Sequence, residues 1–265
     1  MAKKIIPLVP RVETVMRSVG EYLLSVQKGI DVSYKSENNP VTQADITAQE
    51  MLKEGLSKVL PGASFRGEES EWSLWEGFCW VVDPLDGTRA YINREEGWTV
   101  CVALFDCDQV VLGAVFDPLN NNFFSATRDD AFAYKNGKKI FVDETREDVL
   151  LSSRLTDFGL PCKVITAHGA AFKAVQVAQG LAGGYLHFAI DNLGLRIWDV
   201  AATIIIVEKA GGFATCFDGS KVLLRKEDTV IQDVVFANKK MHVLLEEEDL
   251  KKMSEAFIQE EERSL

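Results

Sequence analysis

The spacing of apolar residues predicts two amphipathic helices near the start of the chain. In residues 10–27, apolar side chains recur every three or four positions, and the pattern ends before Gly29. A second pattern of this kind covers residues 46–60 and stops at Pro61-Gly62. The polar stretch 35–40 separates the two. We therefore expect a pair of helices that each present one face to a core.

Short apolar runs of strand length follow the helices. They cover residues 79–82, 98–105, 110–116 and 122–126, and Asn136-Gly137 is typical of a hairpin turn. From about residue 149, apolar strands alternate with helical patterns over 168–180 and 199–210. These patterns predict an α+β first half, about 1–148, and an α/β second half, about 149–265. Because no repeat or linker separates the halves, we expect a single domain, 1–265, with one layered core.

Charge and composition narrow the classes of partner. A formal net charge of −11 and a pI of about 4.9 disfavour nucleic-acid polymers and anionic membrane surfaces as partners. No apolar run approaches the ~18 residues of a membrane span, and the start of the chain lacks the apolar stretch of a signal peptide. We therefore expect a soluble, cytoplasmic protein. An anionic substrate would need a metal ion to offset the repulsion.

Cysteine and histidine usage excludes two further kinds of site. The five cysteines are odd in number, lie mostly in apolar runs and include no Cys-x-x-Cys pair, a pattern that fits reduced core thiols. The three histidines are far apart and His-Glu-x-x-His is absent, so the chemistry of zinc hydrolases is disfavoured.

The segment Asp83-Pro84-Leu85-Asp86-Gly87-Thr88 carries the most specific chemistry. It follows an apolar strand and presents two carboxylates three residues apart, with a proline that fixes φ between them. Carboxylate, carbonyl and hydroxyl oxygens are the ligands that hard divalent cations such as Mg2+ prefer. The same string is also good turn chemistry, because Asp starts turns and Gly accepts positive φ. Alone, the segment leaves both interpretations open.

Acidic residues elsewhere could converge on this segment, and each also has an ordinary structural explanation. Glu68 lies in a polar loop upstream, where glutamates are usually solvated. Asp199 opens an apolar helix, where an aspartate is a common N-cap. Thr42 and Asp45 begin the second helix with the spacing of a capping arrangement.

Taken together, these motifs resemble the inositol monophosphatase-like phosphatases. The family signatures are an acidic pair, the Asp-Pro-x-Asp-Gly-Thr segment and a later Trp-Asp. They stand here in the family's order as Gly67-Glu68-Glu69-Ser70, Asp83 to Thr88, and Ile197-Trp198-Asp199-Val200-Ala201-Ala202. The resemblance covers nearly the whole chain. It implies an αβαβα layered sandwich and a magnesium-dependent phosphatase that hydrolyses a phosphate monoester.

The resemblance also implies roles for single residues. One Mg2+ would bind to Glu68, Asp83 and the carbonyl of Leu85. Asp83, Asp86 and Asp199 would bind a second ion, and some relatives hold a third near Glu68. In such a site one metal lowers the pKa of the attacking water and the other stabilises the leaving alkoxide.

The resemblance assigns catalytic and substrate-binding roles as well. Asp45 and Thr88, with Glu68, would orient and deprotonate the attacking water. The amides of Gly87 and Thr88, which we expect at a helix N-terminus, would bind phosphate oxygens. Phosphoryl transfer depends mainly on positioning and charge neutralisation, so no covalent nucleophile is required.

A competing phosphatase motif is present at Asp106-Cys107-Asp108. After an apolar run, this Asp-x-Asp resembles the nucleophile loop of haloacid-dehalogenase-type phosphatases, in which Asp106 would become phosphorylated. However, the motif lies between two alternating strands at the spacing of a tight hairpin, whereas that family needs a parallel strand followed by a helix. We therefore interpret it as a hairpin turn.

The substrate is the least determined property. The segment from Ser36 to Asp45 and the pair Phe172-Lys173 resemble the branch that hydrolyses 3′-phosphoadenosine 5′-phosphate, and we slightly favour that substrate. Lys173 and His187 could then face a second phosphate or a base, although a lysine on a helix often points to solvent. The inositol branch has a glutamate shortly before Trp-Asp, and here Tyr185-Leu186-His187 stands in its place.

Two alternatives to this function stay open. The first is another phosphomonoester: inositol 1-phosphate, or histidinol phosphate, because Arg89-Ala90-Tyr91 resembles histidinol-phosphate phosphatases. The second is a non-catalytic phosphate-binding or regulatory protein, which would have lost a ligand that this chain retains. Family resemblance further implies lithium sensitivity and a homodimer.

Overall fold

The structure is a computed structural model, which describes residues 4–29, 32–36, 39–70, 74–152, 161–188, 194–224, 231 and 233–247. Its helices are η1 (Ile6–Leu8), α1 (Val9–Val26), η2 (Gln27–Gly29), α2 (Gln43–Val59), α3 (Thr88–Asn93), α4 (Ala170–Ala178), α5 (Ile197–Lys209) and α6 (Lys239–Glu247). Its strands are β1 (Val32–Ser36), β2 (Asn39–Thr42), β3 (Ser64–Gly67), β4 (Phe78–Asp86), β5 (Thr99–Asp106), β6 (Gln109–Asp117), β7 (Asn122–Thr127), β8 (Ala133–Lys135), β9 (Lys138–Ile140), β10 (Val149–Ser152), β11 (Lys163–Thr166), β12 (Gly184–His187), β13 (Phe213–Cys216) and β14 (Val234–Ala237).

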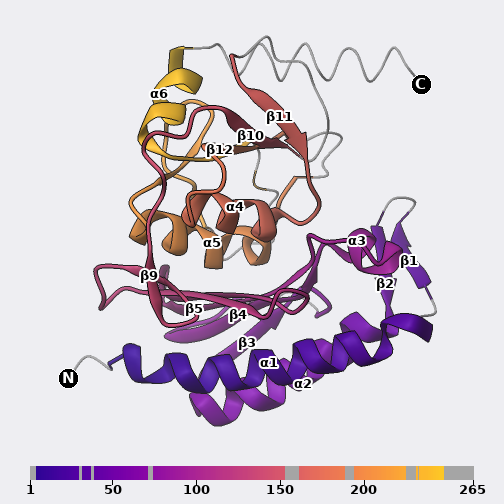
Figure 1. The fold of residues 1–265 in the computed structure, drawn as a ribbon. Coiled ribbons are helices and arrows are strands. Elements are labelled where there is room, and N and C mark those ends of the chain that lie inside the picture. The colour runs from indigo at the N-terminus through magenta and orange to yellow at the C-terminus, as the bar shows by residue number, and fades with distance from the viewer. Residues whose placement is uncertain are drawn as a thin grey trace.

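These elements stack in alternating layers of helices and sheets (Figure 1). Helices α1 and α2 cover one face of a seven-stranded sheet, and α4 and α5 lie between that sheet and a five-stranded sheet, which α6 covers on its outer face. The αβαβα sandwich implied by the resemblance is therefore confirmed. Among the described residues, none of the helices combines the length and apolarity needed to cross a bilayer.

The seven-stranded sheet separates two apolar cores. Its order is β3-β4-β5-β6-β7-β8-β9, with a parallel β3–β4 pair and antiparallel pairs elsewhere. Along β4, Trp80 and Val82 pack toward α1 and α2, whereas Cys79 and Val81 pack toward α4 and α5. Successive side chains of a strand point to opposite faces, so the continuous apolar run predicted for this strand fits a sheet that is covered on both sides.

The smaller sheet corrects part of the prediction for the second half. Its order is β11-β10-β12-β14-β13, and only the β10–β11 and β10–β12 pairs are parallel. Strand β14 runs antiparallel to both β12 and β13. The sheet is therefore mixed, whereas alternating strands and helices alone indicated an α/β arrangement. The described residues between β13 and β14 (217–224, 231 and 233) include no helix, so the alternation of strands and helices that indicates a parallel sheet breaks at this point.

The Asp106-Cys107-Asp108 segment is a hairpin turn, as we interpreted it. Asp106 pairs with Gln109 across the antiparallel β5–β6 ladder, and Cys107 adopts a positive φ of 55°. The carboxylate of Asp106 accepts a hydrogen bond from Arg128 at 3.2 Å. This geometry lacks the strand-to-helix connection that a phospho-aspartate loop of the competing family needs. The Asn136-Gly137 hairpin between β8 and β9 is likewise confirmed.

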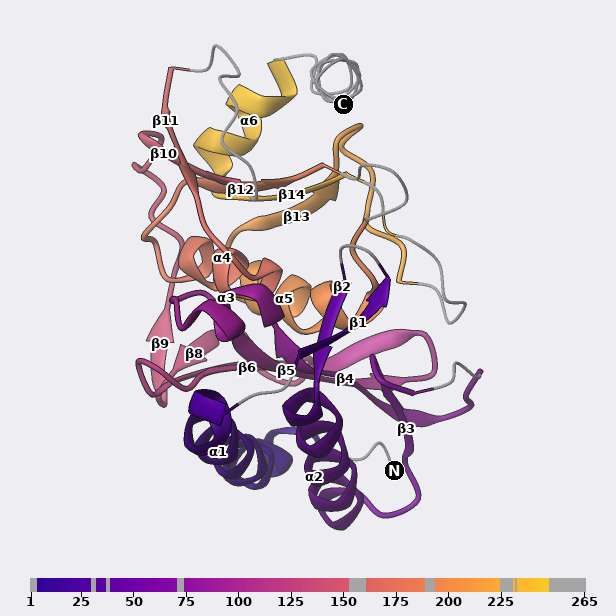
Figure 2. The same ribbon diagram turned by 90° about the vertical axis from the view of Figure 1, so that its right-hand side faces the viewer.

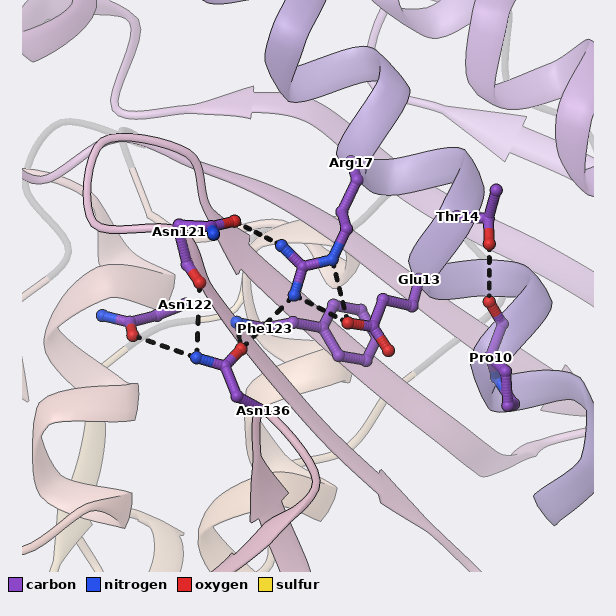
Figure 3. Close-up of polar contacts among 8 residues, drawn as sticks. All are labelled: Pro10, Glu13, Thr14, Arg17, Asn121, Asn122, Phe123 and Asn136. Atoms are coloured by element: carbon purple, nitrogen blue, oxygen red, sulfur yellow. Dashed lines mark hydrogen bonds and ion pairs between the residues drawn. The ribbon is translucent and has the colours of Figure 1, made fainter.

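One arginine joins the outer helix layer to the turns of the large sheet (Figure 3). The guanidinium of Arg17 on α1 donates to Glu13 at 2.7 Å and to Asn121, and it stacks 5.0 Å from the ring centre of Phe116. It also reaches Asn136 at 3.4 Å. Asn121 and Asn136 both have positive φ, in the turns after β6 and β8, so Arg17 fixes α1 against two strained turns.

Candidate active site

The Asp83–Thr88 segment combines a strand end with a bulge. Strand β4 continues to Asp86, four residues beyond the predicted end at 82, and its pairing with β5 shifts register between Asp83 and Asp86. Pro84 has no N–H to donate to the ladder, which is one reason for a bulge at this point. The N–H of Leu85 instead donates to Asp83 Oδ1 at 2.8 Å. Both aspartates are buried, and the bulge lets both contribute to one site.

Asp86 is held by the start of α4. Its carboxylate accepts hydrogen bonds from the N–H groups of Ala170 at 3.1 Å and Ala171 at 2.8 Å, and from the Thr99 hydroxyl at 3.4 Å. Free N–H groups at a helix N-terminus favour a negative charge. The second half of the chain therefore positions a carboxylate that belongs to the first half.

Close backbone packing allows α4 to begin beside Asp86. Gly169, the residue before the helix, has φ of +63°, and a Cβ there would lie 2.1 Å from the carbonyl oxygen of Gly97. The same Cβ would lie 3.0 Å from Asp86 Oδ2. Only glycine adopts this backbone conformation at such a distance without strain.

Asp199 brings the third carboxylate from α5. It is the third residue of the helix, and its Oδ2 accepts the N–H of Arg196 at 2.6 Å. The alternative interpretation of Asp199 as an N-cap is therefore wrong by three residues, although the carboxylate still satisfies a free N–H at the helix start. Ligand atoms of Asp83, Asp86 and Asp199 all lie within 4.8 Å of one another.

Glu68 lies beside this cluster. It directly follows β3, and its N–H donates to the carbonyl of Val82 at 3.2 Å, next to Asp83 on the adjacent strand. Its side chain is partly buried. Burial is the main cause of the raised pKa of Asp83 and of Asp199, and the charge of Glu68 adds to both shifts.

The cluster is electrostatically unfavourable without a cation. Burial, followed by the charges of Glu68, Asp86 and Asp199, raises the pKa of Asp83 well above its usual value. Burial, followed by Asp86 and Glu68, does the same for the pKa of Asp199. The pKa of Asp86 is also raised by burial, although the nearby Lys173 opposes that shift. Mutually repelling buried carboxylates with oxygen donors only are a suitable site for a hard divalent cation.

A second acidic group faces Thr88. Asp45 is buried, and its Oδ2 accepts hydrogen bonds from the N–H of Thr42 at 2.8 Å and from the Thr42 hydroxyl at 2.5 Å. This confirms the capping box, and it leaves Oδ1 directed to the hydroxyl of Thr88 at 3.4 Å. Burial and then the charge of Glu68 raise the pKa of Asp45 against the Thr42 hydrogen bonds. The capping role and a position at the site thus coexist.

Gly87 and Thr88 lie where the chain turns from β4 into α3. Gly87 is the N-cap, with a left-handed φ of 87°, and Thr88 is the first helical residue. The Thr88 hydroxyl has one hydrogen and two acceptors within reach, the carbonyl of Leu85 at 3.1 Å and Asp45 Oδ1 at 3.4 Å. Helix α3 packs beside β2. Strand β2 belongs to the hairpin that precedes α2, and Figure 2 shows this hairpin next to the large sheet. The expected helix N-terminus is therefore present.

Lys173 and His187 lie in positions different from those we expected. Lys173 is only 1% exposed, and its ammonium donates to the backbone carbonyls of Ala167 and Gly169, so it points neither to solvent nor to an open substrate surface. His187 ends β12, opposite Val234 of β14, and both of its ring nitrogens are buried. Neither side chain offers an exposed donor for a second phosphate in this structure.

Sequence reasoning missed the residues that support Asp86. Thr99 and the pair Gly97 and Gly169 carried no recognised motif, although they pack closely around that carboxylate. A faint signal exists at Gly97, which directly precedes the predicted strand 98–105, and at Gly169, which lies at the start of the predicted helix 168–180. Their partnership is visible only once the halves are folded together.

Comparison with known proteins agrees with this geometry. The 3′(2′),5′-bisphosphate nucleotidase CysQ of Escherichia coli (strain K12) is 33% identical over 221 residues, which are 77% of this chain and 88% of that protein. CysQ of Buchnera aphidicola is 31% identical over 225 residues, 78% of this chain and 83% of that protein. Among solved structures, an IMPase of Thermotoga maritima matches with a TM-score of 0.79 at 25% identity, over 94% of this chain and 96% of that one.

The match to a family model is equally extensive. The model of the inositol monophosphatase family covers residues 9–254, which include the acidic cluster and the elements that carry it. With relatives above 30% identity over three quarters of the chain, the assignment rests on sequence, fold and site together. The chain therefore belongs to the inositol monophosphatase family and is a phosphatase.

Proposed function

We propose that this protein is a magnesium-dependent 3′(2′),5′-bisphosphate nucleotidase that hydrolyses 3′-phosphoadenosine 5′-phosphate. We infer metal-dependent chemistry mainly because ligand atoms of Asp83, Asp86 and Asp199 lie within 4.8 Å of one another. The preference for the nucleotide rests on the two CysQ relatives, which bear that activity in their names. The sequence resemblance around Ser36–Asp45 points the same way.

The proposed ligands divide between two ions. Glu68, Asp83 and the Leu85 carbonyl would hold one Mg2+, and Asp83, Asp86 and Asp199 the other, with Asp83 shared. When bound, such ions make water a better nucleophile and neutralise charge on the phosphate and leaving oxygen. The donor set fits, because every ligand is an oxygen and the carboxylates repel one another when no cation is near.

The remaining proposed roles belong to groups of this chain. Asp45 and Thr88 form a hydrogen-bonded pair at 3.4 Å that would orient the attacking water and accept its proton. Burial raises the pKa of Asp45, which makes it a better proton acceptor than an exposed aspartate. The N–H groups of Gly87 and Thr88, at the turn into α3, would bind phosphate oxygens. Glu68, which directly follows β3 beside the cluster, would assist this pair.

The decisive experiment compares phosphate release from four substrates, with and without Mg2+. These are 3′-phosphoadenosine 5′-phosphate, inositol 1-phosphate, histidinol phosphate and fructose 1,6-bisphosphate. We expect the first to be hydrolysed with the highest kcat/KM, and only with Mg2+ present. Faster hydrolysis of inositol 1-phosphate or histidinol phosphate would assign the alternative phosphatase activity. No release from any of the four would favour a phosphate-binding protein.

Further properties follow from the same resemblance. We expect inhibition by Li+ and a cytoplasmic homodimer. Light scattering coupled to size exclusion tests the dimer, and a monomer mass near 29.5 kDa would contradict it. Mg2+ titration by calorimetry counts the ions, with two expected and a third possible near Glu68.

A further inference from the structure

Lys173 is a buried cation next to the acidic cluster. The residue belongs to α4 and is 1% exposed. Its ammonium donates to the carbonyl of Gly169 at 2.7 Å and to that of Ala167 at 3.0 Å, and it lies 4.8 Å from the ring centre of Tyr185. Both hydrogen-bond partners are neutral. The structure therefore buries a full positive charge among groups that cannot compensate it completely.

Asp86 is the charged group that acts on the pKa of Lys173. Burial lowers the pKa of Lys173 to about 8, and attraction to Asp86 opposes that shift. Both groups are bound to the start of α4: the Lys173 ammonium donates to the carbonyl of Gly169, and the Asp86 carboxylate accepts the N–H groups of Ala170 and Ala171.

The carbonyls bound by Lys173 belong to the turn that positions Asp86. Ala167 and Gly169 lie directly before α4, whose first two N–H groups donate to the Asp86 carboxylate. Gly169 is pressed against Gly97 on the opposite side of the same turn. The turn is therefore fixed from outside by backbone packing and from inside by the ammonium, and its end supports a carboxylate of the acidic cluster.

We propose that Lys173 is a positioning residue of the metal site, whose ammonium fixes the turn 167–169 so that α4 holds the Asp86 carboxylate in place for a divalent cation. This inference rests on the proposed metal-dependent function. It replaces the expected contact between Lys173 and a substrate phosphate. Groups that orient a metal ligand are worth about 10- to 100-fold in metal affinity, and Lys173 acts on Asp86 through α4.

The test is the variant Lys173→Met, which removes the charge and both hydrogen bonds but keeps the chain length. Mg2+ affinity is measured by calorimetry on substrate-free protein, and kinetics are measured at fixed Mg2+ with 3′-phosphoadenosine 5′-phosphate and a monophosphate. We expect Kd for Mg2+ to rise about 10-fold or more, kcat to fall for every substrate hydrolysed, and KM to change little. Lys173→Gln, which keeps one donor for the carbonyls, is the second variant if Lys173→Met does not fold.

Lys209→Met is the matched control. Lys209 also donates to loop carbonyls, those of Arg128 and Asp130, but it ends α5 ten residues after Asp199, about 15 Å along the helix. This variant should lower Tm without changing Kd for Mg2+. The proposal is overturned if Lys173→Met leaves Kd for Mg2+ unchanged, if both variants weaken Mg2+ equally, or if only KM for the bisphosphate rises. If Lys173→Met weakens Mg2+ binding but the protein hydrolyses none of the substrates, the positioning role of Lys173 stands and the proposed nucleotidase function is refuted.

Discussion

Replacing Gly169 by alanine tests whether backbone packing builds the acidic cluster. The added Cβ would meet the carbonyl oxygen of Gly97 at 2.1 Å, a distance that side-chain motion cannot relieve because the obstacle is backbone. It would also approach Asp86 Oδ2 at 3.0 Å. The start of α4 must therefore move away from Asp86, and the hydrogen bonds from Ala170 and Ala171 must lengthen.

The expected cost has two parts. Holding a residue with a Cβ at φ +63° costs about 1–3 kcal/mol. Overpacking against a fixed neighbour costs about 1–3 kcal/mol more. The sum for Gly169→Ala is about 2–6 kcal/mol. Gly62→Ala is the matched control, because Gly62 has φ +85° and nothing within 4 Å of its Cβ position, so only a backbone cost of about 1–2 kcal/mol applies.

The assay combines urea unfolding with Mg2+ titration of both variants. We expect Gly169→Ala to lose more stability than Gly62→Ala and, unlike the control, to bind Mg2+ about 10-fold more weakly or worse, because Asp86 loses its orientation. Equal losses of stability in the two variants would show that the turn yields without strain. Unchanged Mg2+ affinity in a destabilised Gly169→Ala would refute the dependence of Asp86 on α4.

Three other predictions follow from the electrostatics and the packing. Burial raises the folded-state pKa of Asp83 and of Asp199, so these two carboxyls bind more protons in the metal-free fold than in the unfolded chain above the unfolded pKa of about 4. Their contribution should therefore lower the metal-free Tm as the pH rises above about 4. At pH 8, Asp199→Asn should raise that Tm, and a flat pH profile would contradict the charge repulsion. Arg17→Met should cost about 1–3 kcal/mol in urea unfolding, from its charged hydrogen bonds, with Mg2+ affinity unchanged; a loss below ~0.5 kcal/mol would show that the turns hold α1 without it. Asp106→Ala should retain full phosphate release, and its abolition with the fold intact would revive the phospho-aspartate interpretation.

Local patterns predicted most of the elements. Helices α1 and α2 begin or end within a few residues of the periodic segments, because their apolar faces pack on the sheet in the simplest way. Strand β4 was predicted too short, since its last four residues include two aspartates and a proline. Asp83 and Asp86 are nevertheless buried, and α4 from the other half of the chain contacts Asp86. Propensity cannot detect that burial, which tertiary structure imposes.

The sequence indicated which residues could form the candidate site, but it did not indicate the residues that support them. Family motifs marked Glu68, Asp83, Asp86 and Asp199, and the structure brings their segments together. No motif indicated that Lys173 would be buried beneath the turn before α4, because a lysine on a helix usually reaches solvent. Its environment depends on Tyr185 and on the turn before α4, whose contacts with Lys173 no local pattern encodes.

The acidic cluster lies at the junction of the two halves of the chain, which explains why it depends on the complete fold. Asp83 and Asp86 come from the large sheet, whereas Asp199 and the N–H groups that hold Asp86 come from α5 and α4. The apolar core between these layers also draws on both halves, with Val81 and Phe105 packed in the same cluster as Val200 and Ile206. Burial of this core favours the association that forces the carboxylates together. A fragment that ends near residue 148 would keep two of the aspartates and lose both the third and the donors that orient Asp86, so it should not bind a divalent cation tightly.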